Sequence, residues 1–325
     1  MDFLNKLKNI INHKETITSS STLDELKYIA PIPSTQGDVL SYLQGNPGGI
    51  TFIHGKAGSG KTYLINQIEK QKQGCIVLTP TNLASNLYRN ASTIHSFFHK
   101  CFDSLEEGFQ NPQNLSKERV ISIIPVLKRI NLLVIDEVSM VRSDTFEMMH
   151  QICSLALNNN QPFGGIPLVV VGDLFQLPPI VSTLAEQEYL NNEYGGYFFF
   201  NSHVIKNNIH QIKLFELTSS YRHGSDSTFS QLLDSFRRPL TVEEKSSLLT
   251  ELNKRVVSIL PDKIVYIASS NEQVRNINTI KLDSLSGKLT TLDAKYKIKL
   301  KGNQSDKYVE LKHSELPTDK DILSQ

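Results

Sequence analysis

The sequence has few cysteines, almost no excess charge and no long apolar run, and each of these deficits argues against a class of protein. The three cysteines (Cys75, Cys101 and Cys153) lack the spacing of zinc ligands, and two of them lie in apolar runs, which favours buried thiols in a reducing compartment. No apolar run approaches the ~20 residues that cross a bilayer. We therefore expect no membrane partner and an intracellular protein, cytoplasmic in a bacterium and nuclear or mitochondrial in a eukaryote.

The net charge of +1 lacks the basic excess that many nucleic-acid-binding domains carry. A protein that grips a strand weakly and repeatedly does not need such an excess, so the near-neutral charge weakens a nucleic-acid function without excluding it.

Arginine is missing from residues 1–13, where apolar residues recur at helical spacing. The absence of Arg and the acidic Asp2 and Glu15 argue against a transit peptide. The Ser-, Thr- and Pro-rich stretch 17–34 follows. We interpret residues 1–34 as an accessory helix and a linker.

From Ile50 onward, short apolar runs alternate with amphipathic stretches. Runs of four or five apolar residues predict strands that are buried on both faces, as in a parallel sheet. The alternation of strand and helix predicts an α/β, doubly wound domain over residues 35–217. The predicted strands are 50–54, 75–79, 132–135 and 168–171, and the predicted helices are 61–71, 117–129 and 143–157.

A second, incomplete domain is predicted over residues 218–325. It contains a candidate strand at 263–268, a candidate helix at 271–285 and an alternating, Lys-rich segment near Tyr296, Ile298 and Leu300.

The segment Gly55-Lys56-Ala57-Gly58-Ser59-Gly60-Lys61-Thr62 fits the P-loop pattern and lies between a predicted strand and a predicted helix. By composition such a match arises in roughly one chain of this length per hundred, so a Gly-rich surface turn is the weaker interpretation. Gly55, Gly58, Ser59 and Gly60 would wrap ATP phosphates with backbone N–H groups. Lys61 would neutralise the β- and γ-phosphates, and the Thr62 hydroxyl would hold Mg²⁺.

Two adjacent acids, Asp136 and Glu137, follow the predicted strand 132–135. At the carboxyl end of a parallel strand they would face a ligand. Asp136 would hold Mg²⁺ through its water shell, and Glu137 would deprotonate the attacking water. Two solvated acids at a strand end are the alternative.

Gln36, at the head of the helix before the first predicted strand, is a candidate for binding the adenine edge as donor and acceptor. An ordinary surface Gln is the alternative.

The segment Gly172-Asp173-Leu174-Phe175-Gln176-Leu177-Pro178-Pro179 follows another predicted strand. Its G-D-x-x-Q-L-P-P pattern is expected by accident in about one chain of this length in 10⁵. At a strand end, Gln176 could hydrogen-bond the γ-phosphate or the lytic water.

In this order and spacing, these three motifs resemble those of superfamily-one helicases of the 5′-to-3′ branch. Within that branch, Pro162-Phe163-Gly164-Gly165-Ile166-Pro167 and the strand after it resemble the signature of the PIF-one (petite integration frequency) family. RecD-like enzymes usually lack this Phe-Gly-Gly element. The resemblance implies a RecA-like fold, followed by a partial second RecA-like domain. It also implies a monomeric motor that uses ATP and Mg²⁺ and acts on single-stranded DNA and single/double-strand junctions.

Further residues acquire roles from the resemblance. Thr81, Asn82 and His95 belong to segments similar to strand-gripping motifs, and Asn271 stands at the start of the second domain. Arg222, in Tyr221-Arg222-His223, would be an arginine finger that meets the γ-phosphate opposite Lys61. A plain surface arginine is the alternative. Phe98 could stack on a base, but a core position is favoured. Residues 98–117 have two equally favoured interpretations, namely an insertion that acts as a wedge to split the duplex and an ordinary surface loop.

The sequence also departs from the family pattern. His223 stands where the family usually has Gln, and the late Ser-Gln-Gly and Leu-Ser-Arg motifs do not occur before Gln325. We therefore expect a chain truncated within its second motor domain. Two other functions stay open, namely a nucleotide-switched ATPase that acts on proteins and a DNA-binding remnant that does not hydrolyse ATP.

Overall fold

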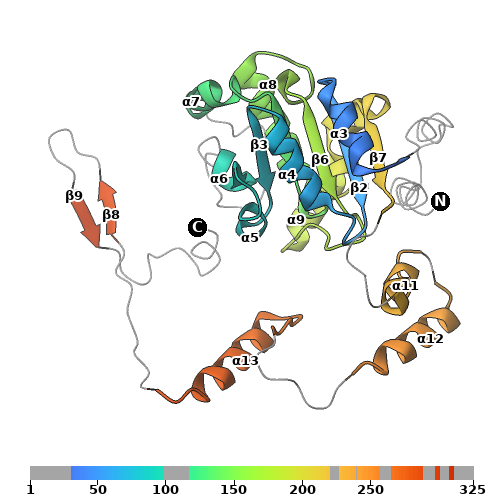
Figure 1. Ribbon diagram of the computed structural model, residues 1–325. Coiled ribbons are helices and arrows are strands. Elements are labelled where there is room, and N and C mark those ends of the chain that lie inside the picture. Colours follow the sequence, from blue (N-terminus) through green and yellow to red (C-terminus); the bar gives the residue numbers. More distant parts are fainter. Residues whose placement is uncertain are drawn as a thin grey trace. The chain divides into compact units, whose positions relative to one another are not determined.

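The computed structural model describes residues 31–98, 117–219, 227–238, 240–256, 265–287, 297–300 and 307–310. The chain divides into two units, Met1–Pro239 and Leu240–Gln325, whose elements are labelled in Figure 1. Among the described residues, no helix has the length and apolarity that a membrane crossing requires. Arg222 and most of the candidate wedge, residues 99–116, lie outside the described residues.

The first unit is built on a seven-stranded sheet in which all pairs of neighbouring strands are parallel. The strand order is β1-β7-β2-β6-β5-β3-β4. This confirms the predicted α/β parallel sheet and all four predicted strands. The strands are β1 (Ile32–Ser34), β2 (Ile50–Gly55), β3 (Cys75–Thr79), β4 (Ala91–Thr93), β5 (Leu132–Ile135), β6 (Leu168–Gly172) and β7 (Lys213–Leu217).

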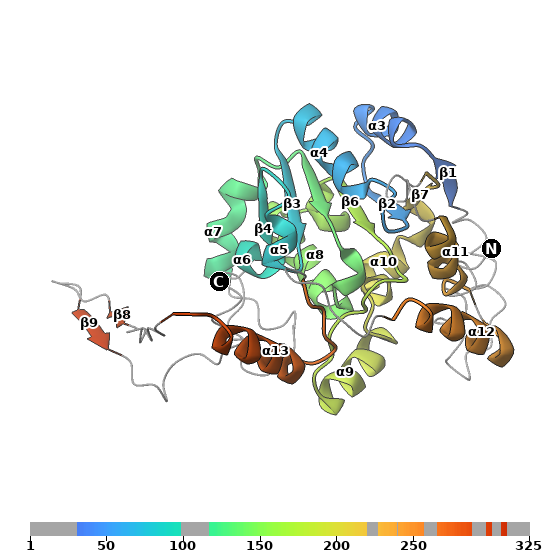
Figure 2. The same cartoon turned by 60° about the horizontal axis from the view of Figure 1, so that its bottom comes forward.

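Helices cover both faces of this sheet, because successive side chains of each strand point to opposite faces. Val169 and Val171 of β6 pack with α3 (Gln36–Gln44) and α4 (Lys61–Gln71). Leu168 and Val170 of the same strand pack on the other side, in the core formed by α7 (Lys117–Leu127), α8 (Ser143–Leu157) and α10 (His203–Asn207) (Figure 2). Continuous apolar runs are therefore what this architecture requires.

Further helices complete the first unit. They are α5 (Asn82–Ser85), α6 (Ile94–Phe98), α9 (Leu184–Tyr194) and α11 (Ser227–Ser235), with the 3-10 helices η4 (Val138–Met140), η5 (Pro162–Gly165), η6 (Phe199–Asn201) and η7 (Ile209–Gln211). Because β6 lies between β2 and β5, the loops after these three strands meet at one edge of the sheet.

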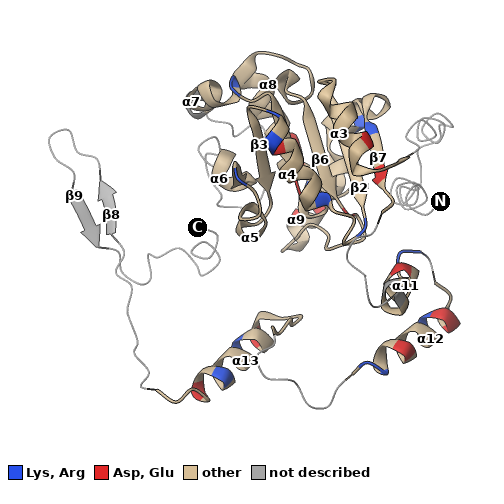
Figure 3. Ribbon diagram, viewed as in Figure 1, with Lys and Arg blue, Asp and Glu red and all other residues tan. Residues whose placement is uncertain are grey.

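The described part of the second unit contains α12 (Val242–Asn253), α13 (Asn271–Asp283) and an antiparallel pair, β8 (Lys297–Leu300) with β9 (Lys307–Glu310). Acidic and basic residues are interspersed along α12 and α13 (Figure 3), in keeping with the net charge of +1. The predicted helix is confirmed as α13. The division after residue 217 and the RecA-like character of this unit stay predictions.

One predicted strand, 263–268, is wrong over its described part, since residues 265–268 have no strand pairing. Val265 and Ile267 are 90% and 96% exposed. An apolar run becomes a strand only where a neighbouring strand takes its backbone hydrogen bonds.

Candidate nucleotide site

The P-loop joins the end of β2 to the start of α4. Gly58 and Gly60 have φ angles of 81° and 82°, a left-handed conformation that glycine adopts without strain. Gly55 is crowded, because a Cβ there would overlap the Ser59 hydroxyl and lie 3.2 Å from the Leu217 Cβ. The loop therefore wraps tightly, and the first N–H groups of α4 face its interior as a site for phosphate.

Lys61 is buried at the first position of α4. Its Nζ donates hydrogen bonds to the carbonyl oxygens of Gly55 (2.8 Å) and Lys56 (3.1 Å). Burial lowers the pKa of Lys61, and the carboxylates of Asp173, Glu137 and Asp136 act against that shift. The ammonium group thus lies among the acids of the neighbouring loops.

The acid pair follows β5, as the sequence predicts. Asp136 is 3% exposed, and its backbone N–H donates to the carbonyl oxygen of Leu78 on β3 (2.9 Å). Glu137 has a φ of 51° and directly precedes the 3-10 helix η4. A non-glycine residue in this conformation costs about 1–3 kcal/mol and occurs mainly at functional sites.

The surroundings of the two acids raise both pKa values. Burial raises the pKa of Asp136, and a hydrogen bond from Tyr88 and the charge of Lys61 oppose that shift in part. Burial and the negative charge of Asp136 raise the pKa of Glu137. A carboxylate with a raised pKa is a better proton acceptor than a solvated one, which suits a general base.

The third loop, after β6, carries Asp173 and Gln176. Asp173 is fully buried, and its carboxylate accepts two hydrogen bonds from the Arg237 guanidinium, both 2.8 Å. Burial alone would raise the pKa of Asp173, but the hydrogen bonds and charge of Arg237 outweigh it and hold that pKa below its usual value. The backbone carbonyl of Asp173 accepts a hydrogen bond from the backbone N–H of Gln176 (2.9 Å). The ion pair between Asp173 and Arg237 therefore also holds the turn that carries Gln176.

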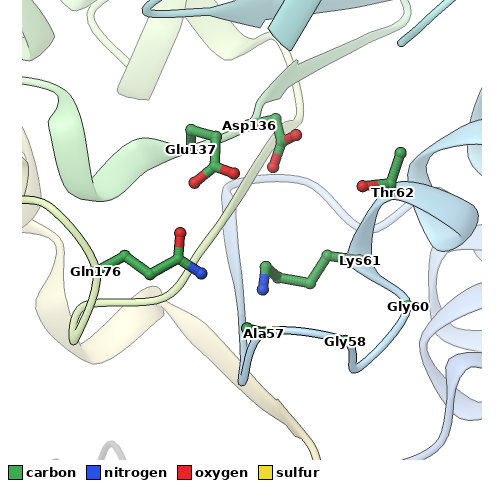
Figure 4. A pocket seen from close by; sticks show the side chains of 8 residues that line it. All are labelled: Ala57, Gly58, Gly60, Lys61, Thr62, Asp136, Glu137 and Gln176. Carbon is green, nitrogen blue, oxygen red and sulfur yellow. The ribbon is translucent and has the colours of Figure 1, made fainter. Parts of the chain in front are cut away.

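These three loops enclose one cavity of about 440 Å³. Figure 4 shows Lys61, Asp136, Glu137 and Gln176 pointing into it from three loops, with Thr62 at its side. Seven of the predicted catalytic, phosphate and metal residues thus come together. The lining residues are Ala57, Gly58, Gly60, Lys61, Thr62, Asp136, Glu137 and Gln176.

Gln36 lies against the outside of the P-loop. Its side-chain amide nitrogen donates to the carbonyl oxygens of Ser59 and Gly60, each at 3.2 Å. It starts α3, whose N-terminus is closed by a capping box between Thr35 and Asp38. Gln36 therefore ties α3 to the phosphate loop, and its proposed contact with adenine stays a prediction.

The residues predicted to touch a strand form a second group at the same edge of the sheet. Thr81 and Asn82 follow β3, His95 follows β4, and all three are exposed. Thr81 also caps α5, because its hydroxyl accepts from the Ala84 N–H. Phe98 is fully buried, so its predicted core position is confirmed. Asn271 is exposed at the start of α13 in the second unit, and its contact with a strand stays a prediction.

The oxygen atoms that line the cavity are also suitable ligands for a magnesium ion. Asp136 Oδ1 is buried and has no hydrogen-bond partner among the described residues, while Thr62 supplies a hydroxyl at the same wall. No cluster of three or more His, Cys, Asp or Glu side chains suited to a metal occurs in the described part of the chain. Magnesium commonly takes one or two protein oxygens together with water and substrate phosphates, which matches this sparse set.

Sequence reasoning missed two contributors to the site. Arg237 lies beyond α11, and its guanidinium carbon stands 4.4 Å from the centre of the Phe175 ring, besides pairing with Asp173. Tyr88 donates a hydrogen bond to Asp136 Oδ2. No local pattern indicates either pairing, because the partners are 64 and 48 residues apart.

The Phe-Gly-Gly element has a structural position in this fold. Phe163, Gly164 and Gly165 have positive φ angles in the turn η5, and the Phe163 ring is fully buried. The backbone N–H of Phe163 donates a hydrogen bond to Nδ1 of His150 on α8 (3.0 Å). The turn therefore fastens α8 to the start of β6, the strand that leads to Gln176.

A tight phosphate loop, a buried lysine, an acid pair and a glutamine at one edge of a parallel sheet define a P-loop nucleotide-binding protein. The model of the PIF1-like helicase family matches residues 35–241, and the chain belongs to this family. It is 31% identical to the ATP-dependent DNA helicase Pif1 of Campylobacter jejuni over 255 residues, 76% of this chain and 54% of that protein.

Two solved structures show the same RecA-like architecture. The Pif1 helicase from Bacteroides in complex with ADP-AlF3 and single-stranded DNA has a TM-score of 0.64 and 27% identity, and the match covers 94% of this chain and 63% of that one. A structure of two coordinating Pif1 helicases at forked double-stranded DNA has a TM-score of 0.61 and 28% identity, over 92% and 66% of the two chains. The present chain spans about half the length of the Campylobacter protein.

Proposed function

We propose that this chain is the motor part of an ATP-dependent DNA helicase. It would couple ATP hydrolysis to movement along single-stranded DNA and to duplex unwinding, in the 5′-to-3′ direction by resemblance. The observation that carries the proposal is the convergence of Lys61, Thr62, Asp136, Glu137 and Gln176 on one cavity. The names of the related proteins, which are ATP-dependent DNA helicases, support it.

Each group at the cavity has a role in phosphoryl transfer. The P-loop N–H groups and Lys61 hold and neutralise the phosphates. A water oxygen attacks the γ-phosphorus, the bond to the β–γ bridging oxygen breaks, and Glu137 accepts the proton of that water. Gln176 hydrogen-bonds the γ-phosphate or the water, so its position reports whether ATP is intact. Thr62 and Asp136 would hold Mg²⁺, which offsets negative charge on the phosphates when bound.

The strand is expected to lie over Thr81, Asn82 and His95, which are exposed at the edge of the sheet that carries the cavity. Contacts of this kind hold phosphate and sugar without selecting a sequence, and they need no large basic patch. Arg222 is proposed to contact the γ-phosphate, and Asn271 is proposed to contact the strand. Both residues belong to the part of the sequence that follows the strands of the sheet. The single/double-strand junction is proposed as a partner because the forked-DNA complex belongs to a similar protein. The monomeric state stays a prediction.

The test is ATP turnover with Mg²⁺, measured with and without a single-stranded oligonucleotide. We expect the strand to raise the rate, and Lys61→Ala to abolish nucleotide binding and turnover. Turnover that ignores the strand would contradict the motor and favour an ATPase that acts on proteins. ATP binding without turnover in either condition would favour the non-hydrolysing remnant.

A further inference from the structure

Tyr88 is a buried tyrosine next to the acid pair that no part of the proposed chemistry uses. It lies in the short connection between α5 and β4, is 9% exposed and packs in the core under α3 and α4. A buried phenol nearly always has a hydrogen-bond partner, because leaving it unpaired is costly. The informative question is therefore which partner this one has.

The phenol contacts a residue assigned to magnesium. Its hydroxyl donates a hydrogen bond to Asp136 Oδ2. Asp136 is further held by the bond from its backbone N–H to Leu78. With Oδ2 engaged and the backbone fixed, the carboxylate has one orientation, in which Oδ1 is the oxygen without a partner among the described residues.

Filling the core does not by itself explain a tyrosine at this position. A phenylalanine ring would occupy the same volume and bury the same apolar face. What the hydroxyl adds is the hydrogen bond to Asp136. Partners of this kind around metal ligands fix the ligand's orientation, and their loss typically lowers metal affinity or activity ~10–100-fold.

We propose that Tyr88 is a positioning residue for the magnesium site, which orients Asp136 so that its free Oδ1 faces the nucleotide phosphates. This inference rests on the proposed function in so far as the metal acts together with ATP. It assigns Tyr88 no contact with substrate.

The test is the magnesium requirement of nucleotide binding by Tyr88→Phe, which removes only the hydroxyl. A fluorescent ADP analogue is titrated into the full chain at a series of Mg²⁺ concentrations and in EDTA. We expect the Mg²⁺ concentration for half-maximal enhancement of binding to rise about tenfold. The affinity in EDTA should stay within about twofold of wild type, because the P-loop is unchanged. Tyr63→Phe is the matched control, since Tyr63 is 58% exposed and should leave both values unchanged.

Two results would overturn the proposal. One is an unchanged magnesium requirement in Tyr88→Phe. The other is an equal loss of affinity with Mg²⁺ and in EDTA, which would show a general packing defect, and the thermal unfolding midpoint of the variant is compared with wild type to detect it. Recovery of the variant's ATP turnover in excess Mg²⁺ is a further expected result that a packing role would not give. The binding titration needs neither turnover nor a strand, so it can fail or succeed independently of the helicase function.

Discussion

Three neighbouring carboxylates differ in pKa because their partners differ. Asp173 is paired with a guanidinium, which holds its pKa low. Burial raises the pKa of both Asp136 and Glu137, and the negative charge of Asp136 raises that of Glu137 further. Groups whose environments separate their pKa values in this way commonly divide the tasks of a site. Here Asp173 has a structural role, and Glu137 is the group suited to take a proton.

Glu137→Gln is expected to bind ATP and to hydrolyse it about 10²–10⁴-fold more slowly, because the amide cannot accept the proton. A base must be ionised, so turnover by the wild type should fall as the pH drops through the raised pKa of Glu137, above the ordinary 4.5. The rate is measured from pH 5 to 8. Wild-type-like turnover by the variant would remove Glu137 from this role.

Arg237→Ala is expected to lower the free energy of unfolding by about 3 kcal/mol or more, because it leaves the buried Asp173 carboxylate unpaired. The Arg237 side chain is 19% exposed and that of Asp173 is 0%. Asp234→Asn is the control, since it breaks an ion pair with Lys56 whose side chains are 46% and 47% exposed, and such pairs contribute at most about 1 kcal/mol. Chemical denaturation measures both. Equal losses would show that the Arg237 pair is no stronger than a surface pair.

At the scale of elements, the strand order decides which loops can meet. The loops after β2, β5 and β6 carry the site because β6 lies between the other two strands. The sequence predicted those strands from short, largely apolar runs, the pattern of strands that are buried on both faces. It did not predict β7, in which Lys213 and Glu216 interrupt the apolar pattern. It also missed the two edge strands β1 and β4, which have three residues each, and it placed β1 in the linker.

The nucleotide site likewise contains residues that the sequence predicted and residues that it did not. Gly58, Lys61, Asp136 and Gln176 were predictable, because each belongs to a local pattern whose spacing the chemistry demands. The contacts made by Tyr88 and Arg237 were not, since they depend on how distant segments pack. Local spacing therefore predicts the groups that meet a ligand better than the groups that hold them in place.

Gly164→Ala tests whether the Phe-Gly-Gly turn is structural. A Cβ there would lie 2.6 Å from the carbonyl oxygen of Cys153, at a φ of +66°. Backbone strain and overpacking together should cost about 3 kcal/mol in the free energy of unfolding. The control is Gly48→Ala, where nothing lies within 4 Å of the added Cβ. The account of the turn would be wrong if both variants unfolded at the same denaturant concentration.

At the scale of the whole molecule, the proposed motor needs the nucleotide cavity to communicate with the strand. The cavity and the exposed Thr81, Asn82 and His95 belong to the same unit and the same edge of its sheet. Coupling between two sites is reciprocal, so a nucleotide state that alters strand binding is itself altered by the strand. This coupling is the central claim of the proposed function.

The most direct measurement is the affinity of the chain for a labelled single-stranded oligonucleotide, in Mg²⁺ with ADP alone and with ADP plus aluminium fluoride. We expect the two affinities to differ by at least about fivefold, the usual lower range of coupling between sites. In Lys61→Ala, which should lose the phosphate contact, the two values should be the same. Equal affinities in the wild type, with both nucleotide states bound, would contradict a nucleotide-driven strand motor.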